Sequence, residues 1–186
     1  LNEPYCTYRY NSGLPAGELH SRLWGVYDAA YRTIREADPD HVIIVEAVWD
    51  PVDLHDPAQY GWENVMYEYH IYLYGDYDNA QGKQIANMEK KLSLIASANY
   101  PVPSLMGEFN YFSNYDAWDK GLALLNKADI HWTTWTYKTM PDCGNWGIYH
   151  HAIKTGKINL EQASFESIKE FWGAMDDVTA NVELIR

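Results

Sequence analysis

The feature that most constrains the fold is an alternation of strand-like and helix-like segments, with no hairpin turn signal between successive strands. Four runs are rich in β-branched and aromatic residues, which favour extended backbone. Antiparallel neighbours can be joined by tight turns, whereas parallel strands need long crossover connections. The sequence therefore predicts an α/β fold with a parallel sheet, with strands at residues 42–48, 65–72, 102–109 and 130–137.

Apolar residues between and around these runs recur at steps of three and four, which places an apolar stripe on one helix face. The stripes predict helices over residues 19–34, 85–96, 118–125 and 165–175, and a brief helix near residues 57–62. Four parallel strands of this kind could form a small open sheet or half of a closed barrel. A complete eight-stranded α/β barrel needs about 250 residues, and this chain has 186.

The charge balance of the chain excludes some partners. The formal net charge is −12, with only 14 Lys and Arg, so we expect no nucleic acid and no anionic membrane as a partner. No apolar run approaches the roughly 20 residues that span a bilayer. The chain starts with Leu1 and shows no signal peptide, and we expect it to start inside a longer protein.

Metal and cofactor motifs are missing from the sequence. Cys6 and Cys143 belong to no C-x-x-C pair, and both a disulfide between them and two free thiols remain open. His150 and His151 have no further ligand at metal-binding spacing. Phosphate-binding and dinucleotide-binding glycine motifs and the G-x-S-x-G nucleophile motif are absent as well. We therefore expect no metal and no cofactor.

Three carboxylates, Glu46, Glu68 and Glu108, lie within or at the end of predicted strands. A carboxylate in a strand must face water, a partner or a cavity, because unpaired burial is costly. Gly107 precedes Glu108 and would let another group approach the backbone closely. Glu108 could be catalytic, or it could pair with a Lys or Arg at the end of its strand.

Short motifs at strand ends add a resemblance to a known family. Asn2-Glu3-Pro4 opens the chain, and Gly107-Glu108-Phe109 follows about a hundred residues later. Between and after them come His70-Ile71-Tyr72 and Trp135. In order and spacing, the chain resembles the second half of glycoside hydrolase family 5, the cellulase family of retaining β-glycosidases. The resemblance implies a (β/α)₈ TIM barrel, of which residues 1–186 supply the C-terminal half, strands 5–8 plus the end of strand 4.

The resemblance also implies the catalytic pair, with Glu3 as acid/base and Glu108 as nucleophile. Retaining hydrolysis needs two carboxyl groups about 5–5.5 Å apart. One must be protonated and the other ionised, so their environments must differ. We expect Tyr72 to donate a hydrogen bond to Glu108. A separation of the two carboxyl groups above about 10 Å, beyond even the inverting range, would refute the assignment.

Further residues are implied as substrate contacts. Asn2 would donate to the sugar 2-hydroxyl, His70 would contact substrate or orient a carboxylate, and Trp135 would stack on the sugar. Two more substrate-binding candidates, Trp49 and Lys138, lie at or after strand ends, where packing explains them at least as well. Other loop residues on the same predicted face, for which a structural role is favoured, are Tyr111, Asp142 and Trp146.

The implied activity is hydrolysis of β-glycosidic bonds in a polysaccharide or oligosaccharide with retention, endo-acting on β-1,4-glucan. Mannan, xylan, β-1,3-glucan and glycolipids remain open substrates. The alternative is a non-catalytic carbohydrate-binding chain, or a truncated half-barrel that needs a partner. The open half-barrel would be completed by an N-terminal half or by a second copy in a homodimer. The resemblance implies a secreted or extracellular protein.

Overall fold

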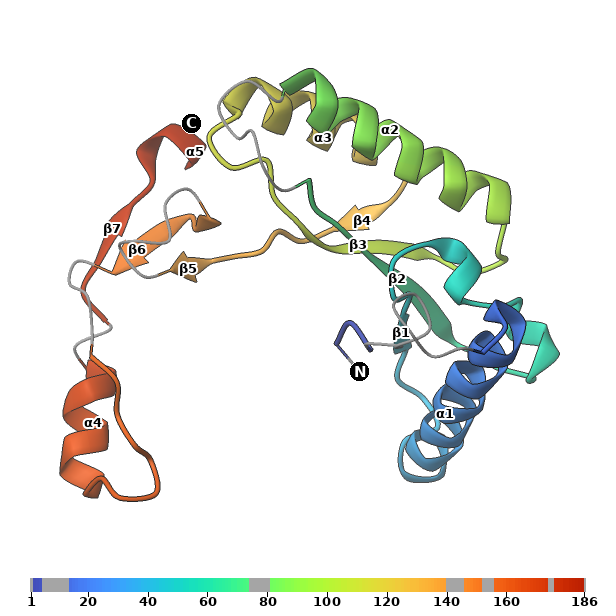
Figure 1. Ribbon diagram of the computed structural model, residues 1–186, viewed down its shortest axis with the longest axis horizontal. Coiled ribbons are helices and arrows are strands. Elements are labelled where there is room, and N and C mark those ends of the chain that lie inside the picture. Colours follow the sequence, from blue (N-terminus) through green and yellow to red (C-terminus); the bar gives the residue numbers. More distant parts are fainter. Residues whose placement is uncertain are drawn as a thin grey trace.

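The computed structural model describes residues 2–4, 14–73, 81–139, 146–151, 156–173 and 176–185. Its centre is a four-stranded sheet with the order β1-β2-β3-β4 (Figure 1). Every neighbouring pair in this sheet is parallel, as predicted. The strands are β1 (Ile43–Glu46), β2 (Val65–Ile71), β3 (Ser104–Phe109) and β4 (His131–Trp132).

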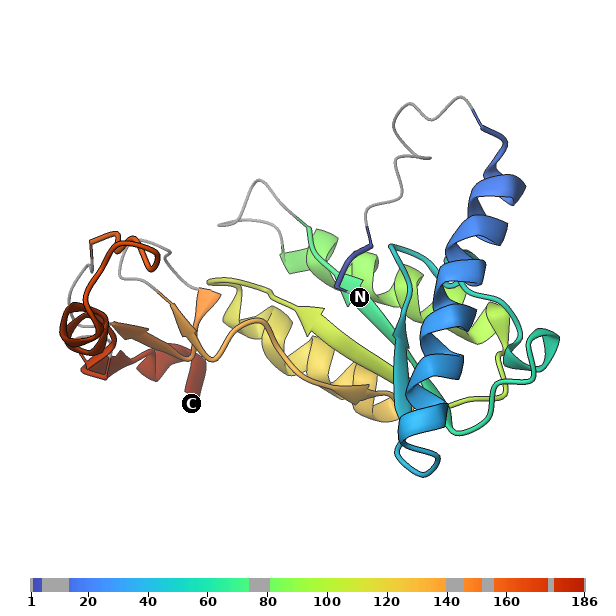
Figure 2. The ribbon, with the colours of Figure 1, turned by 90° about the horizontal axis from the view of Figure 1, so that it is seen from below.

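Helices join these strands, which confirms the predicted alternation. They are α1 (Ala16–Ala37), α2 (Gln81–Ala98) and α3 (Tyr115–Lys127), while two 3₁₀ helices, η2 (Pro51–Asp53) and η3 (Pro57–Gln59), lie between β1 and β2. Figures 1 and 2 show α2 and α3 on one side of the sheet and the N-terminal segment, residues 2–4, on the opposite side. The side that faces the helices is called here the core face, and the other the open face.

The core face carries the large apolar side chains. Alternate residues of a strand point to opposite faces, and Val45, Tyr67 and Tyr69 lie in the hydrophobic core with apolar residues of the three helices. The open face receives the intervening residues of β1 and β2, which include Ile44, Glu46, Glu68 and His70. The polar side chains of the strands are therefore gathered on the face away from the helices.

An irregularity in β3 changes the direction of Glu108. Tyr69 pairs with Met106, but the next residue, His70, pairs with Glu108, so the register skips Gly107. Such a bulge re-aims the side chains that follow it. Without the extra residue, the regular register would set His70 beside Gly107, and Glu108 would point to the core face. The bulge brings Glu108 to the open face beside His70.

Gly107 is required for a second reason. A Cβ atom built at this position would lie 1.6 Å from Glu68 Oε1, because the Glu68 side chain crosses the backbone of β3 there. The sequence-based expectation that this glycine admits a close approach is confirmed, and the approaching group is the Glu68 carboxylate.

The C-terminal part differs from the sequence-based prediction. Residues 130–137 do not form one strand: β4 ends at Trp132, and Lys138–Thr139 form a separate strand, β5. The cause is a change of partner. Thr133 N still donates to Met106 O of β3, whereas Thr136 N donates to Trp146 O.

A second, three-stranded sheet follows that the sequence did not predict. It consists of β5, β6 (Tyr149–His151) and β7 (Val178–Ala180), with β5 and β6 parallel and β6 and β7 antiparallel. Strands of two or three residues are too short for a periodic pattern to reveal.

Two more helices, α4 (Phe165–Gly173) and α5 (Val182–Ile185), lie in the described part of the C-terminal region. Figure 1 shows α4 standing away from the four-stranded sheet, and Phe165 and Trp172 on it are largely exposed. Among the described helices, none has the length and apolarity needed to span a membrane. Cys6, Asp142 and Cys143 lie outside the described residues.

Packing of α3 against the loop after β3 gives a testable prediction. A Cβ at Gly121 of α3 would lie 2.1 Å from Tyr111 Oη and 2.3 Å from Tyr111 Cε2, and the Tyr111 ring is buried against Phe109 and Trp118. Gly121→Ala is expected to lower the free energy of unfolding by about 1–3 kcal/mol through overpacking. The matched control is Gly25→Ala on α1, where a Cβ meets nothing within 4 Å and helix propensity predicts a gain of up to about 1 kcal/mol. Urea denaturation of both variants measures the difference, and equal effects would contradict the packing argument.

Candidate active site

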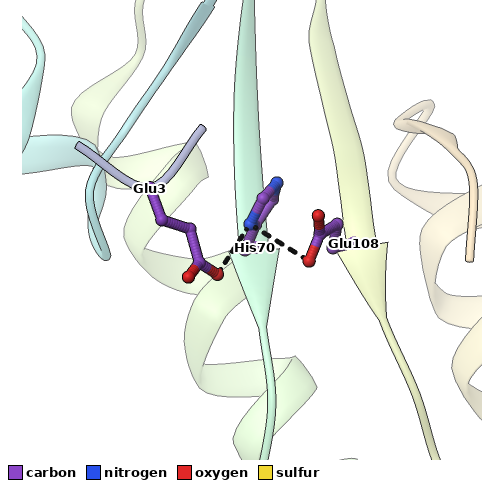
Figure 3. Close-up of side chains that lie close together, drawn as sticks. All are labelled: Glu3, His70 and Glu108. Carbon is purple, nitrogen blue, oxygen red and sulfur yellow. Dashed lines mark hydrogen bonds and ion pairs between the residues drawn. The ribbon is translucent and has the colours of Figure 1, made fainter. Parts of the chain in front are cut away.

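Two carboxylates that are distant in the sequence, Glu3 and Glu108, both lie close to the imidazole ring of His70. His70, on β2, places Nδ1 3.0 Å from Glu3 Oε1 and 3.5 Å from Glu108 Oε2 (Figure 3). Glu3 lies in the N-terminal segment on the open face, and Glu108 lies on β3 next to the bulge. The His70 side chain is only 2% exposed, while Glu3 is 35% and Glu108 15% exposed.

The spacing of this pair is short. Oxygen atoms of Glu3 and Glu108 and a nitrogen of His70 all lie within 4.8 Å of one another. The nearest oxygens of Glu3 and Glu108 are therefore well inside the 10 Å limit set from the sequence, and the structure does not refute the pair.

Tyr72 lies beside Glu108, as expected. Its hydroxyl donates a hydrogen bond of 2.7 Å to Glu108 Oε2. Its ring packs against Trp146, with ring centroids 5.7 Å apart. These contacts hold Tyr72 in place beside the Glu108 carboxyl group.

Two further carboxylates complete the surroundings of His70. Glu46, the last residue of β1, places Oε1 3.4 Å from His70 Nδ1. Glu68 places Oε1 3.7 Å from His70 Nε2. The sequence marked both residues as strand carboxylates without giving them a role. The signal that could have found them is their alternation with the core-facing residues, since Glu68 lies two positions before His70.

The four carboxylates determine the charge of the imidazole. Burial lowers the pKa of His70, but the interactions with Glu68 and Glu3 and the charges of Glu46 and Glu108 outweigh burial and raise it to about 9. His70 is therefore a cation at neutral pH. Burial raises the pKa of Glu46 to about 7, although the Glu3 N–H and the His70 charge act in the opposite direction.

Comparison with known families identifies the family of the chain. A family model described as cellulase (glycosyl hydrolase family 5) matches residues 1–140. The chain belongs to the cellulase family. The matched residues include Glu3, His70 and Glu108. Comparison with curated proteins and with solved structures finds no significant match.

Membership of the cellulase family supports glycoside hydrolase activity in a broad sense. The family implies a TIM barrel, and the part that the structure describes shows its ingredients, four parallel strands joined through helices. The substrate, the catalytic roles and the half-barrel remain predictions from the sequence.

The two tryptophans predicted to contact substrate differ in exposure. Trp135 of this cellulase-family chain is 48% exposed, and its carbonyl accepts a hydrogen bond of 2.5 Å from Asn110 Nδ2. Trp49 is partly buried and, with His70 and Tyr72, lines a cavity of about 210 Å³. Asp53 Oδ2 accepts from Trp49 N at 2.7 Å, which anchors its loop. Asn2 precedes Glu3 and is exposed.

Other sequence candidates lie elsewhere. Lys138, on β5, lines a different cavity of about 590 Å³ with His151, Lys169 and Trp172. The structure does not bring it to the cavity beside His70, and substrate binding by Lys138 remains a prediction. Tyr111 is 3% exposed and packs in the core, in agreement with a structural role.

The carboxylates and His70 are close enough to surround an ion. Two triplets, Glu3 with His70 and Glu108 and Glu46 with Glu68 and His70, each have ligand atoms within 4.8 Å of one another. A metal binds neutral imidazole, whereas His70 carries a proton at neutral pH. A metal in either triplet would therefore have to displace this proton.

The buried imidazolium makes stability depend on pH. The folded state keeps the proton of His70 up to about pH 9, whereas the unfolded state loses it near pH 6.5. The contribution is therefore complete below pH 6.5 and is lost as the pH rises to 9. The free energy of unfolding is expected to fall by on the order of 3 kcal/mol across this window. Urea denaturation at several pH values measures the fall. A His70→Gln variant whose free energy of unfolding falls by the same amount over this pH range would contradict the assignment.

Proposed function

We propose that this chain hydrolyses β-glycosidic bonds of a polysaccharide with retention of configuration, acting inside β-1,4-glucan chains. The observation that carries the proposal is the convergence of Glu3 and Glu108 on His70, with carboxylate oxygens within 4.8 Å of one another. Close carboxylates support retention, because the two carboxyl groups of an inverting pair stand about 6.5–9.5 Å apart.

In the first step, Glu108 attacks the anomeric carbon and forms a covalent bond to the sugar. The glycosidic C–O bond breaks, and Glu3 gives its proton to the leaving oxygen. Tyr72 donates to Glu108 Oε2, and this hydrogen bond favours the ionised nucleophile before attack.

In the second step, a water molecule attacks the anomeric carbon of the glycosyl-enzyme. Glu3 takes a proton from this water, the ester bond to Glu108 breaks, and the carboxylate is restored. The His70 imidazolium contacts both carboxylates. It offsets the negative charge, which shifts between Glu108 and Glu3 during the reaction.

An exposed tryptophan supports a sugar polymer as the substrate. Trp135 is 48% exposed, and indole rings suit the apolar side of a sugar ring. Trp49 and Asn2 would supply further contacts. A polymeric substrate outside the cell agrees with a secreted or extracellular protein, which is part of the same proposal.

We also propose that the chain supplies the C-terminal half of a (β/α)₈ barrel. In the described sheet, β1 and β4 are the two edges, and the open face at β1 exposes Ile44 at 49%. Open edges and exposed apolar residues are liabilities in water. A further half, from the same polypeptide or from a second copy of this chain, would cover both.

Product analysis tests the activity. Proton NMR of cello-oligosaccharide hydrolysis should show the β-anomer first, because two inversions restore the configuration. Parallel assays on mannan, xylan, β-1,3-glucan and a glycolipid identify the preferred linkage. First release of the α-anomer would refute retention, and sugar binding with no hydrolysis of any glycan would favour a carbohydrate-binding chain.

Sedimentation tests the second copy. A homodimer that completes the barrel should sediment at twice the mass of the chain at micromolar concentration. A well-folded monomer at that concentration would exclude this way of covering the open face.

A further inference from the structure

Glu46 is a buried carboxylate at the end of β1 that contacts Glu3 and His70 of the candidate active site. It is 5% exposed, so its negative charge needs compensation. Both of its oxygens accept the backbone N–H of Glu3, at 2.8 and 2.9 Å. Its own carbonyl oxygen accepts the Tyr27 hydroxyl of α1 at 2.5 Å, which fixes the end of the strand against the core.

The backbone that Glu46 holds is unusual. Glu3 has a φ of 38°, in the left-handed region that non-glycine residues seldom adopt. Such a conformation persists only where surrounding contacts determine it. The Glu46 carboxylate supplies a contact of this kind, because a charged acceptor makes a strong hydrogen bond to a backbone N–H.

Glu46 also reaches the imidazole that contacts the Glu3 carboxylate. Its Oε1 lies 3.4 Å from His70 Nδ1, the same nitrogen that lies 3.0 Å from Glu3 Oε1. Glu46 therefore touches Glu3 directly through the backbone and indirectly through His70. The first contact positions the backbone of Glu3, and the second positions its carboxyl group.

We propose that Glu46 is a positioning residue for Glu3, which holds the Glu3 backbone by its N–H and the Glu3 carboxyl group through His70. This inference rests on the proposed acid/base role of Glu3. Glu46 itself touches no substrate atom in this proposal and takes no part in proton transfer to the sugar.

The groups that face Glu46 determine when it is charged. They are the Glu3 N–H and carboxyl group from the N-terminal segment, and His70 and Glu68 from β2. Burial, together with the Glu68 and Glu3 charges, raises the pKa of Glu46 to about 7, against the opposing effects of the Glu3 N–H and His70. The hydrogen bond to Glu3 should therefore strengthen as the pH rises through neutrality.

The first experiment needs no activity. In the full chain, the Glu3 amide proton, followed by ¹H–¹⁵N NMR, should move downfield with a midpoint near pH 7 as Glu46 ionises. Glu46→Gln should abolish this titration. Glu68→Gln, which removes a charge beside His70 without touching the Glu3 N–H, should keep it with a lower midpoint. A flat Glu3 amide in the unmodified chain, or a titration that survives Glu46→Gln, would overturn the proposal.

The second experiment uses leaving groups. Glu46→Gln should lower kcat/KM for cello-oligosaccharides by roughly 10- to 100-fold, because a displaced acid protonates the leaving oxygen poorly. A dinitrophenyl glycoside, whose leaving group needs no proton, should lose far less. An equal loss for both substrates would indicate general damage and overturn positioning. If the unmodified chain hydrolyses neither substrate, the proposed function fails. The amide titration then still tests whether Glu46 accepts the hydrogen bond from the Glu3 N–H.

Discussion

Glu108→Gln is expected to reduce kcat for glycan hydrolysis by roughly 10⁴-fold or more, because an amide cannot form the covalent intermediate. Glutamine keeps the size of the side chain and an oxygen that can accept the Tyr72 hydroxyl hydrogen bond, which is 2.7 Å long in the unmodified chain. Oligosaccharide binding, measured by calorimetry, should therefore persist while turnover disappears. This separation distinguishes a lost nucleophile from a lost binding site.

The control for this variant is a carboxylate outside the site. Glu89 is exposed on α2, and Glu89→Gln changes the net charge by the same amount without touching His70. Its kcat should match that of the unmodified chain. A Glu108→Gln variant that retains more than a tenth of the activity would remove Glu108 from the nucleophile role.

The parallel sheet was predictable because its strands and helices each show a recognisable sequence pattern. Strands β1, β2 and β3 are long enough to show β-branched and aromatic runs, and α1, α2 and α3 carry clear apolar stripes. Parallel pairing then follows from the long crossover connections that such alternation implies. The sheet of β5, β6 and β7 was not predictable, because its pairing depends on contacts distant in sequence.

The candidate site was predictable in its residues and only in part in its geometry. Motif order indicated Glu3, His70, Tyr72 and Glu108, and the structure brings these four together. Gly107 was interpreted as a point of close approach, and the bulge there, which decides the face to which Glu108 points, was not predicted although glycine in a strand can mark one. The contact of Glu46 with the Glu3 N–H joins residues 43 positions apart, and no pattern of period two or 3.6 reports such a pair.

Glu3→Ala is expected to lower kcat/KM for cello-oligosaccharides by about 10²- to 10⁴-fold, the usual contribution of general acid catalysis. A dinitrophenyl glycoside should still form the glycosyl-enzyme, because its leaving group departs without a proton. The second step should then become slow, since no base activates the water. Accumulation of the intermediate predicts a burst of dinitrophenol followed by slow turnover.

Azide distinguishes this role from that of Glu108. As an anion, azide needs no general base, so it should restore turnover of the dinitrophenyl glycoside by Glu3→Ala and yield a glycosyl azide of retained β-configuration. At a variant without the nucleophile, azide would attack the substrate directly and give the α-product. Glu36→Ala, at an exposed position of α1, should show neither burst nor azide effect. An α-azide from Glu3→Ala would exchange the roles of the two carboxylates.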